Sequence, residues 1–122
     1  MLTRPIRGRS LLLTALAAIS IVAMTAGAAE VTLTVVNIET PQGVKIWEPT
    51  SVVARKGDTV TLKLINRHAD EHGYEIAAFG VKEVVDGGKS KDVSFRTDKA
   101  GIFPIKCHLH PAHVSGQLVV LE

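Results

Sequence analysis

The sequence is poor in sulphur and in aromatic residues. It contains one cysteine, Cys107, and its only methionines are Met1 and Met24. A single thiol excludes an internal disulfide framework. Aromatic residues make up 4% of the chain, and no basic stripe is interleaved with them, so nucleic-acid binding is not expected. The 122 residues contain no internal repeat and are enough for one small domain.

The N-terminal region has the organisation of a secretory signal peptide. Its basic start lacks acidic residues and contains Arg4, Arg7 and Arg9. An apolar segment follows over 11–24, and small residues then allow cleavage after Ala28 or Ala29. We therefore predict a signal peptide over 1–29, a mature domain over 30–122 and a periplasmic or otherwise exported protein. An uncleaved N-terminal anchor is the alternative, although the apolar segment is shorter than the roughly 20 residues that cross a bilayer.

Removal of this segment changes the charge of the protein. The whole chain has a net charge of +2, with 14 basic and 12 acidic residues. The predicted mature domain keeps 11 of the basic residues and all 12 acidic ones, so its net charge is near −1. It also contains no methionine, and we expect no membrane span in it.

The mature domain is predicted to consist of short strands. Alternating β-branched and apolar residues, separated by glycine-containing turns, indicate strands over 31–36, 51–54, 59–65, 74–77, 91–96, 102–107 and 117–121. The segment 78–85 is ambiguous, and Pro104 indicates an edge strand or a bulge. About seven strands with frequent turns predict an all-β fold, an antiparallel β-sandwich or barrel.

The residues that carry chemistry are the cysteine and the histidines. The five histidines form two groups, His68 with His72, and His108 with His110 and His113. Thiolate and imidazole together suit copper or zinc. The loop after Cys107 can supply two or three ligands, and a further ligand must come from elsewhere. His72, at the junction of a loop and a strand, is the candidate.

This pattern resembles that of the cupredoxins. The matching residues are His72 and Tyr74, then Phe95, Thr97, Gly101, Phe103 and Cys107, and finally His110. The resemblance covers essentially the whole mature domain and implies a Greek-key β-sandwich. It also implies one copper ion per chain, with equatorial ligands His72, Cys107 and His110, and one-electron transfer to transient redox protein partners.

The sequence departs from this family at the weak axial ligand. Some members with short loops place a methionine three residues after the loop histidine, where this chain has His113. The axial position is therefore open to His113, a carboxylate, a backbone oxygen, water or no ligand. We predict a metal site of His72, Cys107, His110 and His113. A stronger fourth donor favours Cu(II), lowers the reduction potential and shifts the colour from blue towards green or red, so the site partly resembles that of nitrosocyanin.

Two other functions stay open at this point. A copper ion with a free position suits an enzyme that acts on a small molecule, and Cys with three His also forms an acceptable zinc site in a carrier module. Among the remaining histidines, His108 is expected to point away from the site and His68 to be an exposed loop residue. Asn66 either steadies a ligand loop or is an ordinary turn residue. The oligomeric state is not predicted.

Overall fold

The structure is a computed structural model that describes residues 27–122, so the predicted signal peptide lies almost wholly outside the described residues. Nine strands and one 3-10 turn form in this part: β1 (Glu30–Glu39), β2 (Lys45–Glu48), β3 (Ser51–Arg55), β4 (Thr59–Asn66), β5 (His72–Ile76), η1 (Ala77–Phe79), β6 (Val81–Val85), β7 (Ser90–Arg96), β8 (Gly101–Ile105) and β9 (Gly116–Leu121). No helix within residues 27–122 has the length and apolarity to cross a bilayer.

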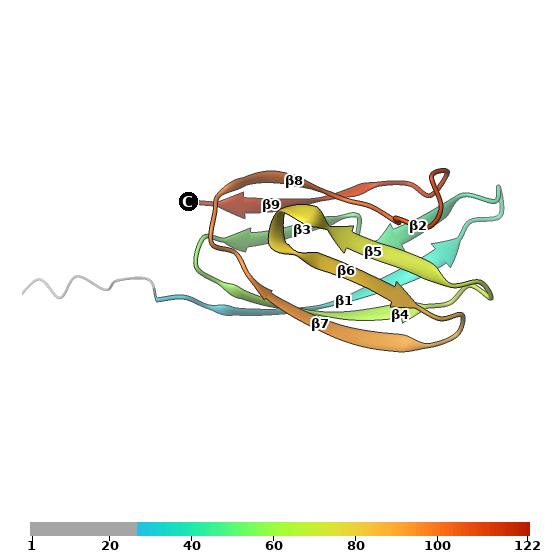
Figure 1. Ribbon diagram of the computed structural model, residues 1–122, viewed down its shortest axis with the longest axis horizontal. Helices are drawn as coiled ribbons and strands as arrows, with labels where there is room; N and C mark the ends of the chain where they lie inside the picture. Colours follow the sequence, from blue (N-terminus) through green and yellow to red (C-terminus); the bar gives the residue numbers. More distant parts are fainter. Residues whose placement is uncertain (1–26) are drawn as a thin grey trace, which may run out of the picture.

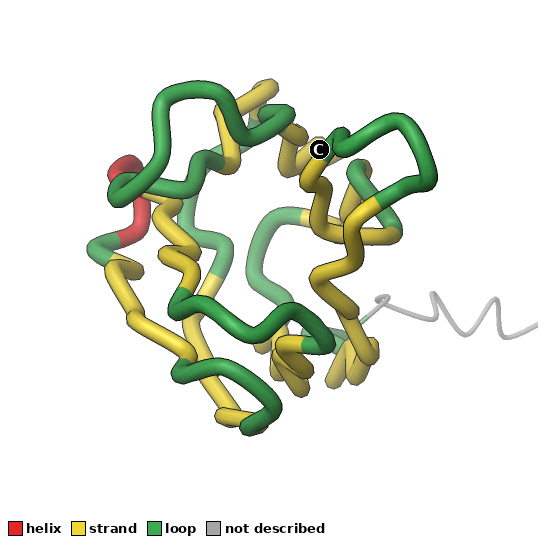
Figure 2. The backbone as a smooth tube through the Cα atoms, turned by 90° about the vertical axis from the view of Figure 1, so that its right-hand side faces the viewer, coloured by secondary structure: helices red, strands yellow, loops and turns green. Residues whose placement is uncertain are grey.

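The strands are arranged as the predicted β-sandwich. One sheet has four strands in the order β2-β1-β4-β7, a second has three in the order β3-β9-β8, and β5 pairs with β6 in a hairpin. Figure 1 shows the strands running along the long axis of the molecule, and Figure 2 shows them end-on around a common interior. The prediction of a β-sandwich is therefore confirmed.

Two of the strand pairs are parallel, which differs from the antiparallel arrangement that the sequence predicted. β1 pairs with β4 in parallel, with Val35 opposite Leu64, and β3 pairs with β9 in parallel, with Val52 opposite Leu118. Parallel neighbours need a crossover connection. The chain provides one between β1 and β4, because β3 crosses to the other sheet before β4 returns.

The core lies between the sheets and follows the alternation of the sequence. In β4, Val60, Leu62 and Leu64 are fully buried, whereas the residues between them face outwards or are half-buried. This period of two is what a strand with one face on the core requires. Trp47 is buried in the core, with 4% of its surface exposed.

Two strands were not predicted clearly. β2 has only four residues, too few to show an alternation, and the ambiguous segment 78–85 divides into η1 and β6. Pro104 lies in β8, at one edge of its sheet, as predicted. An edge position suits proline because its nitrogen has no hydrogen to donate to a second neighbouring strand.

The loops that carry the candidate ligands meet at one end of the sandwich (Figure 1, right). Arg67 N–H donates to Asn37 O at 3.0 Å and so ties the loop before β5 to the end of β1. Val114 N–H donates to Lys45 O at 3.0 Å and ties the loop before β9 to β2. Backbone hydrogen bonds therefore fix the position of both loops relative to the sheets.

Candidate metal centre

Cys107 follows β8 and is held against β5. Backbone hydrogen bonds of 2.8 and 3.0 Å between Glu75 and Lys106 pair the residue before the cysteine with the middle of β5. The Gly73 N–H then donates to Cys107 Sγ at 3.2 Å, and only 8% of the cysteine surface is exposed. This hydrogen bond holds the sulphur in place, and the thiolate is the form of cysteine that binds metals.

His72 is the first residue of β5 and is fully buried. Its Nδ1 atom lies 3.8 Å from Cys107 Sγ. Burial lowers the pKa of His72 from its ordinary value of 6.5 to about 4, and the nearby imidazoles of His113 and His110 act in the same direction. The imidazole is therefore neutral at pH 7, which is the form that binds metals.

His110 is supplied by the tight loop that follows Cys107. Its Nδ1 atom lies 3.5 Å from Cys107 Sγ, and its ring centre lies 4.7 Å from that of His72. His113 N–H donates to His110 O at 3.0 Å and closes a turn over this part of the loop. In contrast to the buried His72 and Cys107, His110 is half-buried.

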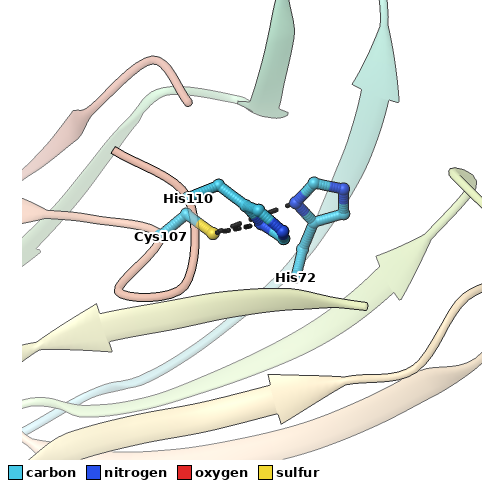
Figure 3. A group of neighbouring side chains, drawn as sticks. All are labelled: His72, Cys107 and His110. Atoms are coloured by element: carbon cyan, nitrogen blue, oxygen red, sulfur yellow. Dashed lines mark hydrogen bonds between the residues drawn. The ribbon is translucent and has the colours of Figure 1, made fainter. Parts of the chain in front are cut away.

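These three side chains fit a single metal ion. One donor atom from each of His72, Cys107 and His110 lies within 4.8 Å of the other two, and Figure 3 shows the two imidazoles meeting at the sulphur. Sulphur-to-nitrogen separations of 3.5 and 3.8 Å are those expected across one ion whose bonds are about 2.0–2.3 Å long. One thiolate and two imidazoles suit copper or zinc and do not suit calcium or magnesium.

His113, the fourth residue of the predicted set, lies beside this group with different contacts. It is buried, and its ring centre is 5.1 Å from that of His72. Its Nε2 atom lies 2.8 Å from Asn37 Oδ1, and its Nδ1 atom lies 3.1 Å from Val114 O. Burial lowers the pKa of His113, so the imidazole is neutral and has one N–H and one lone pair.

Asn66 and Asn37 decide which nitrogen of His113 carries the hydrogen. Asn66 Nδ2 donates to Asp70 O at 2.7 Å and to Val85 O at 3.0 Å, so Asn66 Oδ1 must be the atom that faces Asn37. Asn37 Nδ2 donates to it at 3.0 Å, which turns Asn37 Oδ1 towards His113. His113 Nε2 is therefore the donor, and Nδ1 holds the lone pair.

Asn66 also holds the loop before β5, as one of the two sequence-based interpretations expected. Besides the bonds just described, its Oδ1 accepts from His68 N–H at 3.0 Å. The same amide thus contacts the loop at both His68 and Asp70. It is an interior residue that steadies the chain leading to His72.

The remaining histidines lie around the site and are not among the three grouped residues. His108 packs on Gly73 so closely that a Cβ atom built there would be 2.5 Å from His108 Nδ1. His68 is half-buried, not exposed as expected, and its Nδ1 atom lies 3.2 Å from His72 Nε2.

Sequence reasoning did not find Asn37 or Glu39. Both lie at the end of β1, which reaches the site only because β1 pairs in parallel with β4 and brings Asn37 opposite Asn66. One signal was available, because position 37 continues the inward-facing series of Leu33 and Val35. An asparagine at an inward position needs buried partners.

Comparisons with known proteins agree with this fold. The sequence matches the family described as the cupredoxin-like domain over residues 10–120. No curated protein matches the chain significantly.

Three solved structures illustrate the similarity. Copper nitrite reductase from Nitrosomonas europaea is 23% identical with a TM-score of 0.65, and the match covers 75% of this chain and 41% of that one. Auracyanin A, a "blue" copper protein from Chloroflexus aurantiacus, is 18% identical with a TM-score of 0.58, covering 75% and 98%. The multicopper oxidase mgLAC is 16% identical with a TM-score of 0.61, covering 77% and 39%. The chain thus spans under half of the reductase and oxidase, and these identities show the fold alone.

Proposed function

The chain belongs to the cupredoxin-like domain family, and on that premise we propose that it is an exported protein that binds one copper ion and carries single electrons. The observation that supports this most directly is the grouping of His72 Nδ1, Cys107 Sγ and His110 Nδ1 within 4.8 Å of one another. Export is proposed from the signal-peptide pattern of residues 1–29.

We propose that His72, Cys107 and His110 would hold the copper ion. A copper ion bound there supplies a one-electron couple between Cu(I) and Cu(II). The chain's own contribution is to hold the donors in place. Gly73 N–H fixes the position of the sulphur, and His72 is held as the first residue of β5. Because the donors are already gathered, little rearrangement accompanies a change of charge at the site.

The exposure of the site suits exchange of electrons with other proteins. His72 and Cys107 are buried, whereas the half-buried His110 reaches towards the surface. A partner that docks over His110 approaches the metal through one imidazole, while water is kept from the other donors. We propose transient redox protein partners, which associate through small interfaces.

We propose His113 Nδ1 as the fourth donor. The hydrogen bond from Nε2 to Asn37 leaves the lone pair on Nδ1, where it faces the Val114 carbonyl oxygen at 3.1 Å. Two lone pairs that face each other gain nothing from that contact. To bind a metal, the ring would have to pivot about the Asn37 contact, so that Nδ1 leaves the Val114 oxygen while Nε2 keeps its acceptor.

An optical and electron-spin-resonance spectrum of the copper-loaded protein tests the proposal. We expect an intense thiolate-to-copper absorption, one copper per chain and reversible reduction. Cys107→Ser should abolish the absorption, while Ser94→Ala, an exposed position on β7, should leave it unchanged. Tight retention of zinc, together with no thiolate-to-copper absorption in the copper-loaded protein, would instead indicate the carrier module and overturn electron transfer.

A second variant tests the fourth donor. His113→Met replaces a nitrogen donor by the weak thioether of blue-copper sites. If His113 binds the metal, the spectrum should move towards blue and the reduction potential should rise. An identical spectrum and potential would remove His113 from the ligand set.

An enzyme is the second candidate function, and the position of His113 is the observation that favours it. If His113 keeps both of its present contacts, three protein donors leave a position on the metal for a small molecule. Azide added to the copper-loaded protein would then change its visible and spin-resonance spectra. A spectrum that does not respond to azide would favour electron transfer.

A further inference from the structure

On the side of His72 that faces away from Cys107, a second histidine and a carboxylate form a chain of contacts. His72 Nε2 lies 3.2 Å from His68 Nδ1, and the two rings meet edge to face with centres 5.1 Å apart. His68 Nε2 lies 2.7 Å from Glu39 Oε2. The carboxylate thus contacts His68, His68 contacts His72, and the opposite nitrogen of His72 faces the sulphur.

The donor and acceptor roles in this chain follow from one backbone group. Asp70 N–H, which can only donate, lies 3.2 Å from His68 Nδ1, so Nδ1 accepts. His68 Nε2 then carries the hydrogen and donates to Glu39. The single lone pair of His68 Nδ1 also faces His72 Nε2 at 3.2 Å. Because two facing lone pairs would be unfavourable, His72 Nε2 carries a hydrogen and shares this acceptor with Asp70 N–H, which leaves the lone pair of His72 on Nδ1. Each step therefore fixes the tautomer of the next ring.

The contacts around His68 hold it in this position. Its backbone N–H donates to Asn66 Oδ1 at 3.0 Å, and its carbonyl accepts from Gly88 N–H at 3.1 Å. Its side chain is only 16% exposed, and Glu39 is fixed by the pairing of β1 with β2. The Asp70 carboxylate lies farther away, at 3.5 Å from His68 Nδ1, and is 67% exposed.

We propose that His68 and Glu39 are positioning residues for the metal ligand His72. This relay of hydrogen bonds, from Glu39 through His68 to His72, would present His72 Nδ1 to the metal in one tautomer and one ring orientation. Its negative end at Glu39 would draw the Nε2 hydrogen of His72 outwards and make Nδ1 a stronger donor. This inference rests on the proposed function, because it assigns residues that tune the proposed copper site.

Hydrogen bonds of this kind act on both orientation and basicity. Outer partners of metal-bound histidines typically change metal affinity by about 10- to 100-fold when they are removed. A stronger nitrogen donor favours Cu(II) over Cu(I), so the intact relay should lower the reduction potential. Its removal should therefore weaken Cu(II) binding more than Cu(I) binding.

The first test uses the metal-free protein and nitrogen NMR of the histidine rings. In the wild type, we expect His72 to carry its hydrogen on Nε2 only. His68→Leu removes the acceptor and should leave His72 exchanging between tautomers, whereas His68→Gln offers an amide oxygen and should restore the wild-type signal. If His72 in the wild type carries its hydrogen on Nδ1, or if His68→Leu leaves its signals unchanged, the relay is wrong.

The second test measures Cu(II) affinity by competition with a chelator, together with the reduction potential. His68→Leu should lower Cu(II) affinity about 10-fold or more and raise the potential, and Glu39→Gln should shift both in the same direction. Asp70→Asn is the matched control, because it removes a second carboxylate beside His68 and keeps the backbone donor. Equal effects of Glu39→Gln and Asp70→Asn would show a general charge effect and overturn the relay.

The two proposals fail in different ways. A wild-type protein that takes up no copper would overturn the proposed function, while the ring tautomers of the metal-free protein would still test the relay. A protein that cycles copper normally, with wild-type affinity and potential in both His68→Leu and Glu39→Gln, would overturn the relay and leave the proposed function standing.

Discussion

His113 Nε2 donates a hydrogen bond of 2.8 Å to Asn37 Oδ1, and this contact joins the loop after Cys107 to the end of β1. Both residues are buried, and they are 76 positions apart in the sequence. Asn37 in turn donates to Asn66, which accepts from the loop before β5. The orientation of one imidazole is thus set by a pair of interior amides.

Loss of the Asn37 amide should destabilise the metal-free protein. Asn37→Ala leaves the buried Nε2–H of His113 without an acceptor, and an unsatisfied buried polar group costs about 1–3 kcal/mol. Urea unfolding measures the change. Ser94→Ala removes an exposed hydroxyl and its 2.8 Å contact with Thr61 Oγ1. It is the control for an exposed hydrogen bond and should change stability by less than about 0.5 kcal/mol. Equal stability of the two variants would contradict the structural role of this amide.

Gly73→Ala should disturb the site directly. A Cβ atom at this position would lie 2.5 Å from His108 Nδ1 and 3.0 Å from the His108 backbone nitrogen. The segment that carries Cys107 must then move, so we expect lower stability of the metal-free protein and weaker metal binding. Both can be measured by thermal unfolding and chelator competition.

The double variant Gly73→Ala with His108→Ala separates the two clashes. It removes the overlap with the His108 ring and keeps the 3.0 Å contact with the His108 backbone nitrogen, so it should recover part of the lost stability. No recovery would mean that the backbone contact alone accounts for the effect. A single Gly73→Ala variant as stable as the wild type would contradict the packing described here.

The metal-free protein should lose stability in mild acid. The folded-state pKa of His72 is about 4, below its ordinary value of 6.5, and burial also lowers the pKa of His113. Between pH 6.5 and 4 the unfolded chain therefore binds more protons than the folded one. The stabilisation is complete above pH 6.5 and is lost as the pH falls towards 4, by up to about 3 kcal/mol for His72.

Urea unfolding at pH 7 and pH 5 measures this dependence. His72→Gln removes the titrating group and should flatten the profile between these values. A wild-type protein of equal stability at both values, or a His72→Gln profile as steep as that of the wild type, would contradict the assignment.

The mature N-terminus is expected at Ala29, one residue before the predicted boundary. Ala29 N–H donates to Asp58 Oδ1 at 2.9 Å, and Thr59 N–H donates to Ala29 O at 3.0 Å. The Ala29 contact is the main cause of the lowered pKa of Asp58. Cleavage after Ala28 would turn this amide into an amino cation against the carboxylate.

Intact mass of the exported protein identifies the first residue. Truncation to Glu30 should lower the unfolding temperature, as should Asp58→Asn, which weakens the same contact. A mature protein that starts at Glu30 and is as stable as one that starts at Ala29 would contradict this prediction.

Much of the fold could be predicted because most strands have one buried face. β4 alternates clearly, and its central residues Leu62 and Leu64 are fully buried. The parallel pairing of β1 with β4 could not be read from that alternation, because a period of two is the same for either direction. The direction of pairing depends on which sheet β2 and β3 join. β2 is only four residues long, too short to be predicted from its alternation.

Part of the candidate site could likewise be predicted from the sequence, and part could not. The spacing of Cys107 and His110 within one loop indicated donor atoms that meet, and the structure brings them together with His72. Glu39 and His68 are 29 positions apart and become neighbours only through the packing of β1 beside the loop before β5. No local spacing signals such a contact.

The burial of Cys107 also protects the protein before any metal arrives. Its sulphur lies beneath the loop that carries His110 and accepts a hydrogen bond from Gly73. With only 8% of the cysteine surface exposed, an oxidant or the thiol of a second chain has little access to the sulphur in the folded chain. On the proposed export, this burial would shield the one thiol in an oxidising compartment until a metal binds.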